Sequence, residues 1–196
     1  MSSARYFFGV LIAISLPPAI LWWFIIHPFV GFWRARGVHF TMVVNVVILF
    51  AGISALYAIR GPLMGRDLGT HWVLWVMAGV CVISASWIAL KHRKYLTFWI
   101  LIGGPEVEEG GHGGELLTEG PYAVIRNPRY VEIVLGTMAY VTFANWTGPY
   151  LVAIGTILAI HAVVLLEERE LVQRFGEEFE AYRSRVPCYI PNWGKS

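Results

Sequence analysis

Charge and cysteine are both scarce in this sequence. Asp, Glu, Lys and Arg together make up only 14% of the 196 residues, whereas 57% are hydrophobic. That balance excludes an ordinary soluble domain, and a net charge of +2 gives no reason to expect a nucleic acid partner. The two cysteines, Cys81 and Cys188, form no CxxC pair, so neither a disulfide framework nor a cysteine-based zinc site is indicated.

The familiar nucleotide-binding motifs are absent as well. Segment 103–119 holds six glycines and five glutamates around His112. It contains neither a G-x-G-x-x-G after a strand nor the Gly-Lys-Ser/Thr of a P-loop. One histidine among loosely spaced carboxylates is not typical of a metal site, so we expect no metal. Two interpretations stay open: a flexible acidic loop, or a glycine backbone that approaches a ligand closely.

Long apolar runs are what the sequence has in abundance. About 20 apolar residues in a helix cross a hydrocarbon core roughly 30 Å thick. We therefore expect an all-α integral membrane bundle of about five transmembrane helices, followed by a C-terminal amphipathic helix. The first run is expected to be a retained helix kinked at Pro17-Pro18. The candidate spans are residues 6–26, 40–59, 72–90, 130–143 and 150–166.

The fourth and fifth runs are expected to form a tight hairpin through 145–149, with the short fourth run held inside the bundle. Basic residues then predict the orientation. If the C-terminus is cytoplasmic, the outer segments hold only Arg5, Arg60 and Arg66, and the other 12 of the 15 Lys and Arg residues lie inside. The expected topology is multi-pass, with the N-terminus outside and both the C-terminus and any active site on the cytoplasmic side.

The chain is expected to be one domain, 1–196. Residues 1–90 supply the first three transmembrane helices, and 91–196 supply a polar functional core with the hairpin and the final helix. Within 167–186, apolar residues recur at helical spacing and make one stripe, interrupted only by Gly176. Such a helix lies on headgroups or closes over the opening between the spans. The stripe consists of Leu171, Phe175, Phe179, Tyr182 and Val186.

Segment 120–130, GPYAVIRNPRY, combines rigidity with positive charge. Each proline fixes its own φ and restrains the residue before it, so Gly120-Pro121 and Asn127-Pro128 predict two stiff corners around a short turn or helix. Arg126 and Arg129 would then point at a fixed place where an anion gains most from them. The alternative is that both arginines are ordinary anchors at the membrane surface.

Three glutamates lie where a membrane makes charge costly. Glu132 is two residues into the fourth run, and Glu167 and Glu168 are at the exit of the fifth. Such residues usually have a function. His161 precedes Glu168 by seven residues, so the two share a helix face. The alternative is structural: Glu132 or Glu168 neutralised by Arg126 or Arg129.

Taken together, ELLTEGPYAVIRNPRYVEIVLG and EERELVQRFGEEFEAYRSRVPCYIP resemble the isoprenylcysteine carboxyl methyltransferase family and its phospholipid methyltransferase relatives. The resemblance covers 114–191. Its elements come in order: Leu-x-x-x-Gly-Pro-Tyr, Arg-His-Pro-x-Tyr, Glu-Glu, Phe-Gly-x-x-Phe/Tyr and Val-Pro-x-x-Ile-Pro.

The resemblance implies an integral membrane methyltransferase that uses S-adenosylmethionine and yields S-adenosylhomocysteine. It places the cofactor on the cytosolic side, between the last spans and the C-terminal helix. Arg126, Glu132 and Glu168 are the catalytic candidates. The residues implied to bind the cofactor are Glu115, Leu116, Leu117, Tyr122, Asn127, Pro128, Arg129, Tyr130 and Glu167.

Three positions depart from the family pattern. Asn127 replaces a histidine, so no imidazole base is expected there. Gly114 stands where the family has a histidine, with His112 two residues earlier. Val163 occupies the place of an arginine that meets the substrate in eukaryotic carboxyl methyltransferases, so specificity for prenylcysteine does not transfer.

The acceptor is open at this stage. A lipophilic carboxylate is the first expectation, because it needs no general base, while a phospholipid amine or a small thiol must lose a proton to Glu132, Glu168 or His161. An NADPH-dependent reductase of the sterol type and a non-enzymatic membrane protein are the competing classes. Membrane lipids are the expected partners, and no obligatory protein partner is evident.

Overall fold

The computed structural model describes residues 2–26, 28–93 and 116–192. Within them every regular element is helical, apart from one isolated antiparallel bridge between Asp67 and Trp146. The elements are α1 (Ser2–Ile26), α2 (Val30–Arg36), α3 (Val38–Ala58), α4 (Arg60–Met64), α5 (Trp72–His92), the 3-10 turn η1 (Gly120–Ala123), α8 (Pro128–Ala144), α9 (Thr147–Phe175) and α10 (Glu177–Arg185).

Among the described residues, four helices are long and apolar enough to cross a membrane, which confirms the all-α membrane bundle. They are Ser3–Ile26, Val38–Ala58, Trp72–Lys91 and Thr147–Phe175. The remaining expected span, the fourth run 130–143, is α8, which has 17 residues and is too short to cross the hydrocarbon core upright. Seven of its residues are buried. It is therefore a helix held among its neighbours, as expected for the short run.

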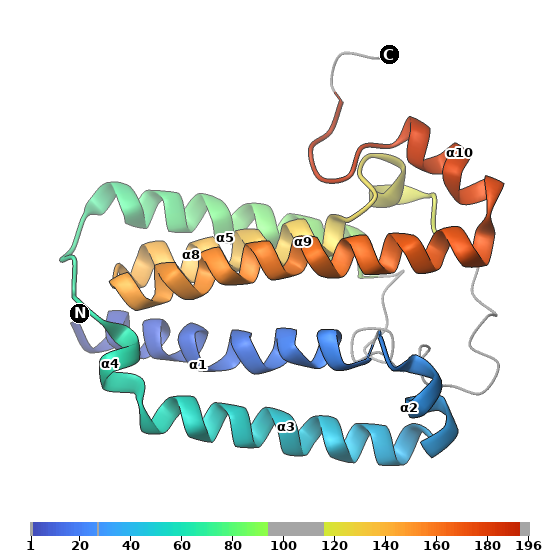
Figure 1. Cartoon of the computed structure of the whole chain (residues 1–196). Helices are drawn as coiled ribbons and strands as arrows, with labels where there is room; N and C mark the ends of the chain where they lie inside the picture. Colours follow the sequence, from blue (N-terminus) through green and yellow to red (C-terminus); the bar gives the residue numbers. More distant parts are fainter. Residues whose placement is uncertain (1, 27, 94–115, 193–196) are drawn as a thin grey trace.

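The bundle is built around α1 (Figure 1). Helix α3 packs on one side of α1, while α8 and α9 pack on the other, and α5 lies against the far side of α8. The N-terminus, α4 and the α8–α9 turn share one end of the bundle, and α2, η1 and α10 share the other. The segments predicted to be outside and inside thus separate to opposite ends.

Helix α1 is a single helix through Pro17 and Pro18. The second proline ring packs against Gly52 of α3, where an added Cβ would come within 2.7 Å of the Pro18 Cβ. The ring therefore lies in the space that the glycine leaves, and this lets α1 and α3 approach closely.

The α8–α9 hairpin is as tight as the sequence predicts. Asn145 ends α8 in the left-handed region, with φ of 54°, a conformation that Asn tolerates better than most residues. Two residues later α9 begins. A Cβ on Gly148 would fall 1.8 Å from the Leu63 carbonyl oxygen, so only glycine allows α9 to start against α4.

A buried arginine ties this end of the bundle together. The Arg5 side chain is only 4% exposed and forms an ion pair with Asp67. Its Nε donates to the Ala144 carbonyl oxygen at 3.0 Å, and its Nη1 donates to Thr70 Oγ1 at 3.2 Å. The hydrogen bond from Arg5 holds the pKa of the Asp67 carboxyl below its usual value. One side chain thus links α1, the α4–α5 loop and the end of α8.

The final helix differs from the sequence expectation. We predicted one helix through 167–186, but Gly176 adopts a φ of 53° and separates α9 from α10. A positive φ is inexpensive for glycine and ends a helix, so this residue redirects the chain instead of being carried along. The predicted stripe still faces inward, because Phe179 is 1% and Tyr182 4% exposed, and α10 packs on α9.

We predict that Arg5→Ala lowers the free energy of unfolding by about 1–3 kcal/mol, because buried acceptors lose their donor and Asp67 loses its partner. Thermal unfolding in detergent measures it. Arg66→Ala is the matched control, since the Arg66 side chain is exposed, and it should change stability by less than about 0.5 kcal/mol. Equal stability in both variants would contradict the structural role of Arg5.

Candidate functional site

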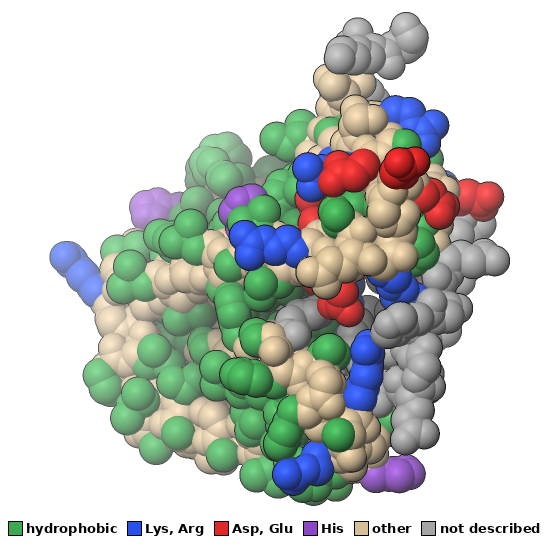
Figure 2. All heavy atoms as spheres, turned by 45° about the vertical axis from the view of Figure 1, so that its right-hand side comes forward, with side chains coloured by type: hydrophobic (Ala, Val, Ile, Leu, Met, Phe, Trp, Pro, Cys, Tyr) green, Lys and Arg blue, Asp and Glu red, His purple; other side chains and the backbone are tan. Residues whose placement is uncertain are grey.

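Polar side chains gather at the end of the bundle that carries η1 and α10. Figure 2 shows the Asp and Glu side chains of that face gathered near α10, whereas Lys and Arg side chains are spread more widely and much of the remaining surface is hydrophobic. The first turn of α10 carries Glu177, Glu178 and Glu180, and its last turn carries Arg183 and Arg185. Segment 120–130 and the end of α9 meet at this same end (Figure 1).

The two predicted proline corners are confirmed. Pro121 lies in the first turn of η1, and Pro128 is the first residue of α8, where its missing N–H is needed by no partner. Pro128 is fully buried. Between the corners, the Tyr182 hydroxyl of α10 donates to the Tyr122 carbonyl oxygen at 2.7 Å, so α10 holds η1 in place.

Tyr130 and Glu167 form the inner pair of the site. Tyr130, on the first turn of α8, is 7% exposed and donates its hydroxyl to Glu167 Oε1 on α9. The ring packs in a cluster with Ile160, Val163 and Val164 of α9. A carboxylate hydrogen-bonded at the edge of an apolar cluster is held in one position and interacts strongly with any nearby cation.

Tyr122 lies within the electrostatic reach of three charged residues. Burial raises the pKa of its hydroxyl to about 12, Arg129 opposes that rise, and Glu167 and Glu132 add to it. The ring therefore stays neutral at physiological pH. Arg129 also has its guanidinium 5.1 Å from the centre of the Trp23 ring on α1. Three of the predicted site residues, Arg129, Glu132 and Glu167, thus lie near the ring of a fourth, Tyr122.

Arg126 and Glu168 form an outer clamp. Arg126 donates from Nε and Nη2 to Glu168 Oε1 at 3.0 and 2.8 Å. Its Nη1 donates to the carbonyl oxygens of Val186 and Arg183, at 2.6 and 3.1 Å. Both side chains of the ion pair are nearly buried, at 12% and 13% exposure. These contacts give the pair a structural role, and their catalytic role stays a prediction.

A strap of four residues, 186–189, follows α10 and lies on this clamp. The Arg126 and Asn127 amides donate to the carbonyl oxygens of Pro187 and Cys188, at 2.9 and 3.2 Å. Asn127 Nδ2 lies 3.3 Å from the Cys188 sulfur. Burial raises the pKa of that thiol, and the neighbouring Glu168 carboxylate adds to the rise. Asn127 thus contacts the strap, and its predicted cofactor contact is not tested.

The strap also reaches His161. The Tyr189 hydroxyl lies 3.0 Å from His161 Nδ1. His161 and Glu168 face the strap together, as their spacing of seven residues predicts. Glu167 lies about 100° around α9 from Glu168 and faces α8 instead. The two consecutive glutamates therefore face different neighbours: Glu167 contacts Tyr130 of α8, and Glu168 belongs to the clamp with Arg126. The predicted contact of Glu167 with a cofactor stays a prediction.

The remaining predicted residues divide in two groups. Leu116 and Leu117 precede η1, and Leu117 is 38% exposed. Glu115, His112 and segment 103–115 lie outside the described residues, so the predicted cofactor contact of Glu115 stays a prediction. Among the described residues, no group of three His, Cys, Asp or Glu side chains could hold a metal ion.

Sequence reasoning did not give roles to the Tyr182, Cys188 and Tyr189 side chains. Tyr182 was placed only on the apolar stripe, although its hydroxyl fixes η1. The signal for the strap was present in the Val-Pro-x-x-Ile-Pro element. The sequence did not reveal what the strap contacts, because Arg126 and Asn127 lie about 60 residues away from it in the chain.

Comparison with known proteins identifies the family to which the chain belongs. A profile of the phospholipid methyltransferase family matches residues 73–178, more than half of the sequence, and the chain belongs to this family. The match runs from α5 to the start of α10 and so contains η1, α8 and α9. No solved structure matches the chain significantly.

The individual relatives are named either as methanethiol S-methyltransferases or as a protein-S-isoprenylcysteine O-methyltransferase. The chain is 28% identical to methanethiol S-methyltransferase 2 of Bradyrhizobium diazoefficiens over 127 residues, 63% of this chain and 45% of that protein. It is 34% identical to protein-S-isoprenylcysteine O-methyltransferase of Schizosaccharomyces pombe over 79 residues, 39% and 33% respectively. A methanethiol S-methyltransferase of Crocosphaera subtropica is 35% identical over 81 residues, 38% and 28%. The chain thus spans less than half the length of these relatives.

We predict that Arg126→Met frees the strap, since Glu168 and two carbonyl oxygens lose their donor. The rate at which a maleimide labels Cys188 should rise roughly tenfold, measured in a Cys81→Ser background. Arg183→Met is the control, because the Arg183 side chain is 44% exposed and should leave the rate within about twofold. An unchanged rate in Arg126→Met would show that the strap is held by other contacts.

Proposed function

We propose that this integral membrane protein is an S-adenosylmethionine-dependent methyltransferase whose cofactor binds at the inner pair. The observation that carries the proposal is the contact between Tyr130 and Glu167, which brings the two ends of the family motif together. The family match supports the reaction class. The uneven distribution of the basic residues supports a site on the cytoplasmic side.

The side chains around Tyr122 suit this cofactor. S-adenosylmethionine carries a sulfonium, an amino group and a carboxylate, and it supplies the methyl group with its own leaving group. Glu167 fits a cationic part, and Arg129 fits the carboxylate. The neutral Tyr122 ring offers a face to a cation or to the adenine. Arg126, which we expected to share the anion, is occupied by Glu168.

A small apolar thiol is the acceptor that the observations favour. Two of the relatives above are named as methanethiol S-methyltransferases. In addition, Val163, where the eukaryotic enzymes have an arginine, is 2% exposed within the apolar cluster and offers no charge to a carboxylate. A lipophilic carboxylate is the second candidate, and the name of the Schizosaccharomyces relative supports it.

Cofactor binding can be tested directly by calorimetry in detergent. We expect S-adenosylmethionine to bind and NADPH not to bind. Glu167→Gln should weaken S-adenosylmethionine binding tenfold or more, because it removes a charge-assisted contact, and Tyr130→Phe should weaken it about fivefold. The control is Glu178→Gln on the exposed side of α10, with unchanged affinity. Wild-type affinity in both site variants would move the cofactor elsewhere.

The acceptor can be tested with radioactive methyl donor. Membranes containing the protein are offered an alkyl thiol, a prenylated carboxylate and phosphatidylethanolamine. We expect a volatile methyl thioether from the thiol. A base-labile methyl ester would support the second candidate, and label in the phospholipid would overturn both.

A further inference from the structure

A groove runs between α5 and α8 and no part of the site described above accounts for it. Its volume is about 580 Å³, and small residues make much of its wall. Gly79 and Gly136 each have no atom within 4 Å of the place where a Cβ would stand, so both open onto free space. The floor at the α8–α9 turn end is formed by Trp75 and Phe143, whose rings stack 5.9 Å apart.

The helix register places the other end of the groove beside Glu132. Helices α5 and α8 run antiparallel (Figure 1), so residues at equal distances from the stacked Trp75 and Phe143 rings lie at the same height. Ser86 comes eleven residues after Trp75, and Glu132 comes eleven residues before Phe143. Both therefore lie about 16 Å from the stacked rings. Ser86 lines the groove. Glu132 precedes Gly136 by four residues, so the two share the face of α8 that lines it.

Glu132 also connects the groove to the inner pair. It lies close enough to Tyr122 to raise the pKa of that hydroxyl, as Glu167 does from α9. In addition η1, which carries Tyr122, packs against α5. A molecule that lies in the groove with its polar end toward η1 would therefore meet Glu132 first and then the Tyr122 ring, near which the predicted cofactor-binding residues lie.

We propose that the α5–α8 groove binds the apolar body of the acceptor thiol and that Glu132 receives its proton. This inference rests on the proposed function. The groove is open and mostly apolar, with Gly and Ala residues along much of its wall, which suits an alkyl chain, and Glu132 beside its Ser86 end repels an anionic acceptor. Glu132 is a catalytic residue in this scheme, because it touches the reacting group.

The chemistry balances without another reagent. As the thiol sulfur forms its bond to the methyl carbon, the bond between that carbon and the donor sulfonium breaks, and its electron pair stays on the donor sulfur. The S–H bond becomes strongly acidic while the new bond forms, so a carboxylate is a sufficient base. The proton passes to Glu132 and later to water. The charged residues that act with Glu132 on the Tyr122 hydroxyl are Arg129, on the same helix, and Glu167 on α9. Lys91, five residues beyond Ser86 on α5, lies over the Trp87 ring.

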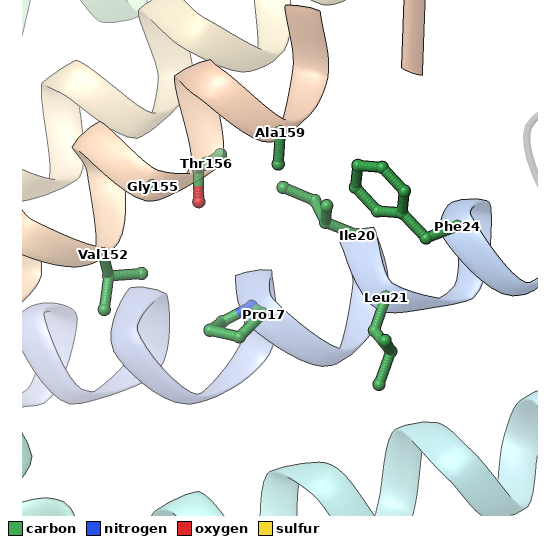
Figure 3. Close-up of a pocket in the computed structure, with 8 residues that line it drawn as sticks. All are labelled: Pro17, Ile20, Leu21, Phe24, Val152, Gly155, Thr156 and Ala159. Carbon is green, nitrogen blue, oxygen red and sulfur yellow. The ribbon is translucent and has the colours of Figure 1, made fainter. Parts of the chain in front are cut away.

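A second apolar cavity provides a matched control. It lies between α1 and α9, has a volume of about 340 Å³ and is lined by side chains such as Ile20 and Ala159, which face each other in Figure 3. Gly155 of α9 opens onto it, again with no atom within 4 Å of a Cβ. The cavity lies along the N-terminal half of α9, before Glu167 in the chain, and none of the described residues that line it is acidic.

The first experiment fills each cavity in turn. Gly136→Leu should raise KM for hexanethiol at least tenfold and weaken its binding, measured by calorimetry on protein loaded with S-adenosylhomocysteine, where no methyl transfer occurs. Affinity for S-adenosylmethionine should stay within about twofold. Gly155→Leu should change none of these values. If Gly155→Leu weakens hexanethiol binding and Gly136→Leu does not, the acceptor lies between α1 and α9 and the proposal fails. Equal effects of both variants would indicate lost packing, and they too would overturn it.

The second experiment tests the proton acceptor. Glu132→Gln should lower kcat about a hundredfold at neutral pH with little change in KM. Its rate should then rise tenfold for each pH unit toward the pKa of the free thiol, because only thiolate formed in solution reacts, whereas the wild-type rate is nearly flat over that range. A parallel pH profile in variant and wild type would remove Glu132 from the reaction. Methylation of carboxylates alone, with no thioether, would instead defeat the proposed acceptor, so the two failures are distinguishable.

Discussion

The ion pair between Arg126 and Glu168 is the contact on which the arrangement of this end of the bundle depends. It joins segment 120–130 to α9. Arg126 also donates to the carbonyl oxygens of Arg183 and Val186, and so holds the last turn of α10 and the chain that follows it. A nearly buried guanidinium needs both charge and hydrogen-bond partners to offset its desolvation, and here it has them. Because the strap then holds Asn127 by its backbone, the first turn of α8 starts in one place, and Tyr130 meets Glu167.

Glu167 and Glu168 are consecutive residues of α9 that make different contacts. Consecutive helical residues point about 100° apart, so Glu167 turns toward α8 and the apolar cluster while Glu168 turns toward the strap. Glu168 neutralises Arg126, and the Tyr130 hydroxyl orients Glu167. In the proposed function, Glu167 is the carboxylate that meets the cationic part of the cofactor.

Local features of the chain were predictable from sequence, and contacts between distant segments were not. Proline corners, the short α8 and the inward stripe follow from residue type and spacing, and the structure has all three. The prediction of one helix through Gly176 was wrong because the helix propensity of glycine, about 1 kcal/mol less favourable than that of alanine, does not include the packing between helices that stabilises a bend. The sequence left Arg126 with several possible partners, since Glu168 is 42 residues away. The groove beside Glu132 depends on the register between α5 and α8, which no local pattern contains.

The negative charge of Glu132 affects which acceptor the proposed site can bind. The sequence alone did not decide between a carboxylate and a thiol. Two carboxylates about 4 Å apart repel by roughly 4 kcal/mol at an effective dielectric constant of 20. Since Glu167 already lies near the same tyrosine, an acceptor carboxylate entering past Glu132 would add a third negative charge. A neutral thiol avoids that repulsion on entry and gains a base when it reacts. In the proposed scheme, the glutamate that makes a carboxylate acceptor costly is therefore the base for a thiol, and the two acceptors are alternatives at this site.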